Sequence, residues 1–305
     1  MCISVIIPTY NPNINRLKQT LAGLSHQTLD FQYWELILID NNSTNSFKEK
    51  IDTSWHQNFQ IFKEKKQGLT YARLKGFEKA RGELIVMVDD DNILAADYLE
   101  KAIDFMTDNK QVGAVGGKSI GLYEGFEPEP WTKEFLSMIA VRDLGEDIMI
   151  SNNKIAEYPS CAPIGAGMVI RKHLLISYIE YITSGKNQIT DRIGNSLASG
   201  GDNEINIFVL KQNFAVAYQP QLILEHIIPE NRLSKAYLSR LNFESSCSWV
   251  KLLHSQNLNV WAPIAKSSLV LRYIKSYVML KAWYTKANFV KWKGSCGIFK
   301  GLSEI

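Results

Sequence analysis

The chain has 305 residues, of which 46% are apolar and 21% charged, and its net charge at pH 7 is +3. This length allows one large α/β domain, or a domain of about 240 residues with an appendage. The four cysteines are scattered along the chain, which excludes a disulfide framework or a cysteine-based metal site and favours reduced thiols in a cytosol. No secretory signal is expected, because residues 2–7 lack a basic region and are typical of a first strand.

The charge is unevenly distributed along the chain. Residues 245–305 carry nine Lys or Arg and one Glu, a net charge of +8, which leaves −5 for residues 1–244. Two parts of opposite charge suggest two roles.

The first 120 residues alternate short apolar runs with helical patterns. Strands are expected at 3–7, 34–39, 59–63, 84–88 and 112–115, and helices at 14–24, 71–81 and 95–106. Pro8 is expected to end the first strand, and Gly82 the second helix. In that helix Ala72, Gly76 and Ala80 form a stripe of small residues that would let it lie close to the sheet. This alternation predicts a mostly parallel sheet flanked by helices.

Three of the expected strands end in polar residues. The polar ends are Thr9, Tyr10 and Asn11; Asp40, Asn41 and Asn42; and Asp89, Asp90 and Asp91. In open α/β sheets ligands bind outside the carboxyl ends of the strands. Three adjacent carboxylates repel one another unless a hard cation lies between them, so a divalent cation site is expected at residues 89–91. An acidic turn or a helix cap would explain any one of these Asp residues alone.

The second half of the chain is less regular. Residues 120–164 form a long non-periodic stretch, a pattern typical of functional or mobile segments, and 184–199 is expected to be a loop. Gly165 and Gly167 precede an apolar run at 168–170, where they would serve either a close ligand approach or a bulge. A helix is expected at 205–211 and strands at 215–218 and 222–224.

Two acidic residues, Asp202 and Glu204, stand at the start of the helix expected at 205–211. Helix capping explains Asp202 as well as a catalytic role does. His226 is expected at a strand end, where an imidazole could serve as a metal ligand.

Taken together, these segments resemble the family 2 glycosyltransferases, inverting nucleotide-sugar transferases of the GT-A fold. The resemblance rests on residues 4–11, 35–43, 68–73 and 82–91, which occur in the family's order within the first 120 residues. A further match lies at 200–204, where this chain has Gly201-Asp202 and family members commonly have Glu-Asp. The resemblance implies an α/β GT-A fold, Rossmann-like, with a mostly parallel sheet flanked by helices and a C-terminal basic helical extension.

The resemblance also implies a domain organisation. A catalytic domain would span 1–232, with a nucleotide-sugar-binding half at 1–120 and an acceptor half at 121–232. A basic helical region would span 233–305.

Site residues follow from the same resemblance. Asp89, Asp90 and Asp91 contain the Asp-x-Asp element, in which Asp91, together with Asp89 and His226, would bind Mg²⁺ or Mn²⁺ at the donor diphosphate. Asp202 would be the base that deprotonates the acceptor. The residues implied to contact the nucleotide are Pro8, Thr9, Tyr10, Asn11, Asp40, Asn42, Gly68, Arg73, Asp89 and Asp90.

The implied reaction is metal-dependent transfer of a sugar from a nucleoside diphosphate, UDP by default with GDP or TDP open, to a glycan or lipid-linked hydroxyl. Such a reaction serves the synthesis of surface polysaccharides or glycoconjugates. A nucleotidyltransferase is the nearest alternative, but it would favour a Gly-rich loop with Lys or Arg after the first strand, where this chain has residues 8–12. A non-catalytic Mg²⁺-binding α/β module would be far shorter and would have no use for Asp202.

Helices are expected in the basic tail at 233–254 and 264–285. In the second, an apolar face is expected from Val270, Tyr273, Tyr277, Leu280 and Tyr284, and Arg272, Lys275 and Lys286 lie on the opposite face. No uncharged run approaches the roughly 20 residues of a membrane span.

Two interpretations of this tail are open. It packs on its own catalytic domain, or residues 251–300 contact an anionic membrane peripherally, with Trp283, Phe289, Trp292 and Phe299 at the headgroup boundary. We favour the second, which places the protein in the cytoplasm on the inner face of the cell membrane. No nucleic-acid-binding module accompanies the charge.

Overall fold

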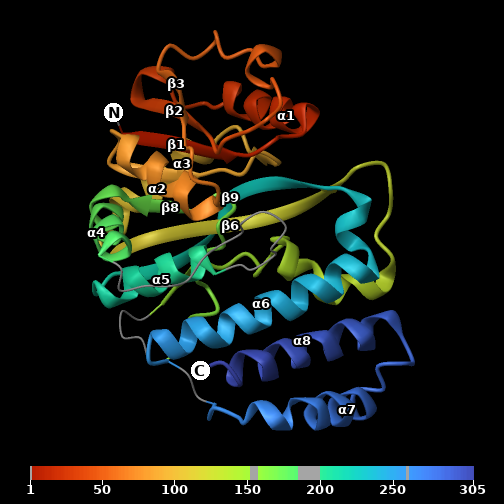
Figure 1. Ribbon diagram of the computed structural model, residues 1–305. Coiled ribbons are helices and arrows are strands. Elements are labelled where there is room, and N and C mark those ends of the chain that lie inside the picture. The colour runs from red at the N-terminus through yellow and green to blue at the C-terminus, as the bar shows by residue number, and fades with distance from the viewer. Residues whose placement is uncertain (1, 152–156, 185–199, 259–260) are drawn as a thin grey trace. The chain divides into compact units, whose positions relative to one another are not determined.

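Two structural units make up the chain in our computed structural model (Figure 1). Unit 1 comprises Met1–Leu122, Ala140–Lys186 and Ile205–Ile227, and unit 2 comprises Tyr123–Ile139, Asn187–Glu204 and Ile228–Ile305. The structure describes residues 2–151, 157–184, 200–258 and 261–305. The loop expected at 184–199 therefore lies, apart from Ser184, outside the described residues. The domain boundaries expected at 120 and 232 stay predictions.

The described residues form a nine-stranded sheet in the order β3-β2-β1-β4-β8-β6-β9-β5, with β7 paired to β9. The strands are β1 (Ile3–Thr9), β2 (Trp34–Asp40), β3 (Phe59–Lys63), β4 (Leu84–Met87), β5 (Asn92–Leu94), β6 (Val112–Tyr123), β7 (Met149–Ile150), β8 (Val169–Arg171) and β9 (Ala215–Ile228). Strands β3, β2, β1 and β4 pair in parallel, whereas β8 pairs antiparallel with both β4 and β6, and β9 with both β5 and β7. The predicted α/β class is confirmed, but the sheet is mixed rather than mostly parallel, because the parallel pairs are confined to the N-terminal half.

The helices are α1 (Ile14–Ser25), α2 (Leu69–Lys79), α3 (Tyr98–Asp108), α4 (Lys172–Thr183), α5 (Gly201–Lys211), α6 (Lys235–Ser255), α7 (Leu269–Met279) and α8 (Lys286–Leu302). Short 3-10 helices occur at Phe31–Tyr33, Lys48–Lys50, Pro130–Ile139, Glu230–Leu233 and Lys266–Ser268. Two of the α-helices, α4 and α8, were not predicted from the sequence.

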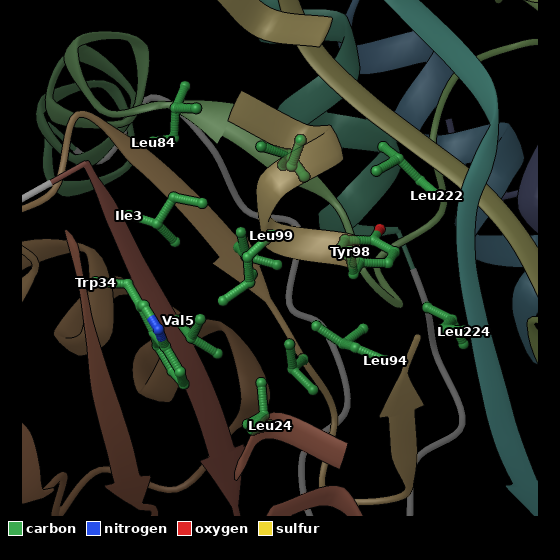
Figure 2. Close-up of a cluster of buried hydrophobic side chains, with 14 of the residues drawn as sticks. Ile3, Val5, Leu24, Trp34, Leu84, Leu94, Tyr98, Leu99, Leu222 and Leu224 are labelled. Atoms are coloured by element: carbon green, nitrogen blue, oxygen red, sulfur yellow. The ribbon is translucent and has the colours of Figure 1, made fainter. Parts of the chain in front are cut away.

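Alternate residues of β1 pack into two hydrophobic clusters, because successive side chains of a strand point to opposite faces. Ile3, Val5 and Ile7 pack with side chains of α1 and α3, and Figure 2 shows part of this cluster, including Leu24 and Tyr98. Ile6 packs on the other face with side chains of α2, α4 and α5. Helices thus cover both faces of β1, which is why most of its side chains are apolar.

Helix α2 lies close to the sheet, as its small-residue stripe predicted. A Cβ atom at Gly76 would lie 2.4 Å from Cγ2 of Ile6. The prediction that Gly82 ends this helix was wrong, because α2 ends at Lys79 and Ala80 is its C-cap. Gly82 is needed for another reason: a Cβ there would lie 2.5 Å from the carbonyl carbon of Ile3.

Two predictions about proline and strand ends were also wrong. Pro8 lies inside β1 rather than after it, and pairs with Ile39. Proline lacks the N–H that a strand needs for pairing. On the side of β1 that faces β4, pairing ends at Ile6 and Met87, so Pro8 interrupts no hydrogen bonds there. The two strands expected at 215–218 and 222–224 are one continuous strand, β9.

Unit 2 contains α6, α7 and α8, and α8 lies between the other two (Figure 1). Close packing of α8 on α6 depends on glycine, since a Cβ at Gly297 would lie 2.2 Å from the carbonyl oxygen of Phe243. No helix among the described residues is long and apolar enough to cross a membrane.

The helix expected at 264–285 is shorter than predicted, because α7 covers only Leu269–Met279 of this range and α8 begins after it. Helix α7 ends at Met279, and Lys281 adopts a left-handed φ of +48°. Thr285 then caps α8, since its side chain accepts a hydrogen bond from the N–H of Asn288 at 3.0 Å.

Candidate active site

The polar ends of three parallel strands meet at one edge of unit 1. Thr9 at the end of β1 pairs with Asp40 at the end of β2. Strand β4 pairs with β1 up to Met87, so the acidic turn that follows it begins at the same edge. The register of the parallel sheet therefore brings together residues that are up to 82 positions apart in the sequence, from Thr9 to Asp91.

Hydrogen bonds fix the acidic turn after β4. Thr9 Oγ1 donates to the carboxylate of Asp90, tying the turn to β1. Asn92 is fully buried and accepts from the N–H of Asp89 at 3.2 Å, while its amide donates to Asp91 Oδ1 at 3.2 Å. Neighbouring side chains thus hold the carboxylates of Asp90 and Asp91, and Asn92 fixes the backbone of Asp89.

His226 lies beside Asp91 because β5 pairs with β9. Asn92 is in register with His226, and the N–H of Ile227 donates to the carbonyl oxygen of Asp91 at 2.9 Å. His226 Nε2 lies 3.4 Å from Asp91 Oδ1, and the two residues are only 4% and 6% exposed. The prediction that His226 stands at a strand end was wrong, since it lies inside β9.

Asp91 and His226 fit two positions around one divalent cation. Two donor atoms on adjacent positions of an octahedral Mg²⁺ lie about 3 Å apart, close to the separation of these two atoms. A carboxylate oxygen and an imidazole nitrogen are also suitable donors for Mn²⁺. Within the described ranges, no three His, Cys, Asp or Glu side chains are grouped closely enough to hold a metal ion. Such an ion would therefore need further oxygen ligands from a phosphate or from water.

Arg73 adds a positive charge to this edge. It lies in the second turn of α2, is 7% exposed, and its Nη2 lies 4.0 Å from Asp89 Oδ1. Its guanidinium therefore places a positive charge next to one of the three carboxylates of the acidic turn. The implied contact of Arg73 with the nucleotide stays a prediction.

Asp40 is buried at the end of β2 and has two partners. Its Oδ1 accepts from the N–H of Ser43 at 2.8 Å, and its Oδ2 lies 2.9 Å from Lys48 Nζ. Burial raises the pKa of the Asp40 carboxyl, but the hydrogen bonds from Lys48 and Ser43 outweigh burial and hold the pKa below its ordinary value. Asp40 is therefore an ionised acceptor at neutral pH.

Asn41 is a positioning residue that the sequence analysis did not single out. It is buried, and its amide donates to the carbonyl oxygen of Lys66 at 2.7 Å, while its Oδ1 accepts from the N–H of Gly68 at 2.8 Å. Asn41 thus ties the start of α2 to the end of β2. The available signal was its place between Asp40 and Asn42, although nothing in the sequence named its partners.

The remaining residues predicted to contact the nucleotide differ in exposure. Tyr10 is 47% exposed, so its ring is available for stacking, whereas Pro8 is buried within β1. Asn11 Oδ1 accepts from the N–H groups of Thr44 at 2.8 Å and Asn45 at 3.2 Å, so Asn11 also shapes the loop after β2.

Asn42 and Gly68 occupy special backbone conformations beside this edge. Asn42 has a left-handed φ of +63°, and Gly68 has a φ of +136°. For Gly68, a residue with a side chain would be strained there.

Asp202 lies in the first turn of α5, which begins at Gly201 rather than at Ile205 as predicted. It is half-buried, and its Oδ1 accepts from the N–H of Asn203 at 3.0 Å. An acidic residue in a first turn is stabilised by the helix dipole, as the capping interpretation expected. Residues 201–204 cluster with unit 2, and the catalytic role of Asp202 stays a prediction.

Comparison with known proteins gives the family. The family described as Glycosyl transferase family 2 matches residues 4–165, more than half of the chain. An uncharacterized glycosyltransferase of Haemophilus influenzae is 36% identical over 126 residues, which are 40% of this chain and 49% of that protein. TuaG of Bacillus subtilis, named as a candidate teichuronic acid biosynthesis glycosyltransferase, is 30% identical over 131 residues, with coverage of 40% and 49%. The chain spans about half the length of these curated relatives.

Solved structures show the fold. A mannosyltransferase from Pyrobaculum calidifontis, in complex with GDP-Man and Mn²⁺, has a TM-score of 0.62 and 16% identity, covering 99% of this chain and 87% of that one. S. aureus TarS 1–349, in complex with UDP-GlcNAc, has a TM-score of 0.53 and 14% identity, covering 100% and 91%. At these identities the similarity shows the fold alone. The chain has the GT-A fold and belongs to glycosyl transferase family 2.

Proposed function

We propose that the protein transfers a sugar from a nucleoside diphosphate donor, a UDP-sugar by default, to a hydroxyl of a glycan or lipid-linked acceptor. The observation that carries the proposal is the distance of 3.4 Å between Asp91 Oδ1 and His226 Nε2. Asp91 follows β4, a strand that lies within the residues matched by the family. Fold neighbours that were solved with GDP-Man and with UDP-GlcNAc support a nucleotide-sugar donor.

We call the edge of unit 1 at which β1, β2 and β4 end the strand-end edge. In this proposal the strand-end edge binds the donor. Asp40 accepts a hydrogen bond from the base, with Tyr10 available to stack on it. Asp89 and Asp90 accept hydrogen bonds from ribose or sugar hydroxyls. The diphosphate then lies toward Asp91, which the acidic turn holds in a fixed position.

Asp91 and His226 would hold a Mg²⁺ or Mn²⁺ ion, with the donor diphosphate supplying further oxygen ligands. When bound, this ion would supply Lewis-acid stabilisation of the negative charge on the departing diphosphate. Arg73 supports the same edge by balancing the charge of Asp89, from which its guanidinium is 4.0 Å away.

Asp202 is the proposed general base. It would take the proton of the acceptor hydroxyl as that oxygen attacks the anomeric carbon, while the bond to the diphosphate breaks on the opposite side. This single displacement inverts the anomeric configuration. The proposal requires Asp202 to come within hydrogen-bond reach of the bound acceptor.

We further propose that this reaction serves surface polysaccharide or glycoconjugate synthesis on the cytoplasmic side of a membrane. The name of the Bacillus subtilis relative supports a polysaccharide product. A lipid-linked acceptor would bring the protein to a membrane surface.

A screen of UDP-, GDP- and TDP-sugars tests the proposal, with Mn²⁺, with Mg²⁺ and with a chelator. We expect one donor to release its nucleoside diphosphate only when a metal is present, and the Asp91→Asn variant to release none. Release of pyrophosphate from a nucleoside triphosphate would instead assign a nucleotidyltransferase. If the protein neither hydrolysed nor bound any donor with either metal, the proposal would be wrong.

A further inference from the structure

Helix α7 carries apolar side chains on two opposite faces. One face packs on α8: Trp292 Nε1 donates to the carbonyl oxygen of Tyr273 at 3.0 Å, and the rings of Tyr277 and Trp292 lie 5.0 Å apart. Ser276 is the only residue of α7 that is buried. Tyr273 and Tyr277, which belong to the apolar face expected for this helix, thus pack inside unit 2 against Trp292, which was expected at a lipid headgroup boundary.

The outward face of α7 is also apolar. Val270, Leu271, Ile274, Val278 and Met279 are exposed by 66%, 72%, 58%, 57% and 71%. Most of these residues are spaced three or four positions apart, so they lie on one side of the helix. The turn after α7 adds Trp283 and Tyr284, exposed by 59% and 76%. We call these seven residues the α7 patch.

A helix that is apolar all round is normally buried, in a protein core or in a membrane. Among the described residues of unit 2, α8 covers the inner face of α7. Scattered exposed apolar residues are ordinary on soluble proteins, but seven of them between positions 270 and 284 mark a contact surface.

Cations lie beside the α7 patch. Lys266, Arg272, Lys275 and Lys281 are all exposed, and no ion pair joins any of them to an acidic side chain in the described part of the chain. Residues 245–303 contain no Asp or Glu. The positive charge around the patch is therefore left for a partner to neutralise.

The cations of α6 and α8 behave differently. Lys286 and Lys291 of α8 pair with Glu129 and Glu134. Lys251 of α6 and Lys300 of α8 both pair with Glu304. Unit 2 thus neutralises much of the charge on these two helices and none of the charge beside the α7 patch.

We propose that the α7 patch lies in the headgroup region of an anionic lipid bilayer. Its aliphatic side chains would enter the acyl boundary, its cations would meet anionic headgroups, and Trp283 and Tyr284 would occupy the interface between them. The helix has 11 residues, so it is about 16 Å long and lies along the surface rather than across it.

Charge also argues against a second copy of this chain as the occupant. A two-fold symmetric contact through α7 would bring Arg272 and Lys275 near their own copies, with no acidic residue of α7 to pair with them. An anionic lipid surface offers the complementary charge over the whole patch. This proposal does not depend on the chemistry proposed for unit 1.

Cosedimentation with lipid vesicles tests the charge component. The intact protein is mixed at low salt with vesicles of phosphatidylcholine alone, or with vesicles in which about one third of the lipid is phosphatidylglycerol. We expect binding to the anionic vesicles, weakened by salt. Lys275→Gln with Lys281→Gln should lower the partition coefficient by about 30-fold. Lys18→Gln with Lys110→Gln, which removes the same charge from exposed positions of unit 1, should leave it unchanged.

A second pair of variants tests the apolar component. Leu271→Gln with Ile274→Gln should lower the partition coefficient by about tenfold or more. Ile120→Gln with Ile176→Gln, at residues of unit 1 that are each 47% exposed, should not change it. All variants should keep the same circular dichroism spectrum and the same nucleotide-dependent thermal shift, which separates lost lipid binding from misfolding.

Two results would overturn the proposal. One is an intact protein that stays in the supernatant with anionic vesicles at low salt. The other is a concentration-dependent dimer, seen by sedimentation velocity and abolished by Leu271→Gln with Ile274→Gln, without vesicle binding. The second result would assign the patch to a copy of this chain.

Discussion

The strand-end edge of unit 1 and the α7 patch of unit 2 depart from the usual arrangement of side chains in opposite ways. In unit 1, charged side chains such as Asp40, Asp91 and Arg73 are buried, and partners hold them in fixed positions. In unit 2, apolar side chains such as Leu271 are exposed. Buried charge and exposed apolar surface are both unfavourable unless something compensates for them. In the two proposals above, a ligand supplies this compensation: a nucleotide-sugar with its metal in unit 1, and an anionic lipid surface in unit 2.

The largest effect is expected from a substitution of Asp202, which tests the proposed sugar transfer. Asp202→Asn should lower kcat by about 10²–10⁴-fold, because the acceptor loses its general base. Nucleotide binding should be nearly intact, because the donor residues lie at the strand ends of unit 1. Steady-state kinetics and a nucleotide thermal shift measure both quantities. Asp104→Asn, at an exposed acidic residue of α3, serves as the control. Unchanged turnover in Asp202→Asn would remove Asp202 from the mechanism.

A matched pair of leucines sharpens the contrast between buried and exposed apolar residues. Leu24, in the cluster of Figure 2, is 1% exposed, whereas Leu271 is 72% exposed. Leu24→Ala should lower the free energy of unfolding by about 2–5 kcal/mol. Leu271→Ala should change it by less than about 0.5 kcal/mol. Urea denaturation measures both; a loss at Leu271 as large as that at Leu24 would mean that the outward face of α7 is packed within the protein.

A glycine tests how tightly the parallel strands are packed. Gly82→Ala should lower the free energy of unfolding by about 3 kcal/mol, because the added methyl group meets the backbone of Ile3, which cannot move aside. The neighbouring exposed Glu83→Ala should change it by less than about 0.5 kcal/mol. Equal stability of the two variants would contradict the packing described for β1.

His56 tests the burial of a titratable group in unit 1. Burial beside Phe31, Trp34 and Trp55 lowers the pKa of His56 to about 4 from 6.5. The folded state therefore binds the proton less readily than the unfolded state, so stability is lost as pH falls below 6.5 toward 4. His56 alone should account for a loss of about 2 kcal/mol between pH 7 and pH 5. Urea denaturation at the two pH values should show that loss in the wild type and a smaller one in His56→Asn; equal losses would contradict the assignment.

The sequence predicted the strand-end edge well because parallel pairing leaves little freedom. Once Ile3, Trp34 and Leu84 are aligned by their apolar runs, Thr9 and Asp40 meet and the acidic turn follows at the same edge. The position of His226 was harder to predict. It depends on β5, a strand of three residues that shows no detectable period. The partners of Asn41 lie in a loop, whose path periodicity does not determine.

Unit 2 was predicted less well, for physical reasons. Helix α8 contains Gly294, Gly297 and Gly301, which lower helix propensity and hide the helix, although these glycines are what allow α8 to approach α6. Helix α7 is apolar on both sides, so its sequence pattern could not show which side packs on α8. Only the contacts of Tyr273 and Tyr277 with Trp292 identify the inner face.

Titration of UDP into the wild type and into Asp91→Asn, with and without Mn²⁺, tests the central claim that the strand-end edge of unit 1 binds a nucleotide through a metal. Calorimetry should detect UDP binding by the wild type only with Mn²⁺, and no binding by Asp91→Asn in either condition, although both proteins have the same circular dichroism spectrum. Binding of UDP and Mn²⁺ by Asp91→Asn with the affinity of the wild type would contradict the claim.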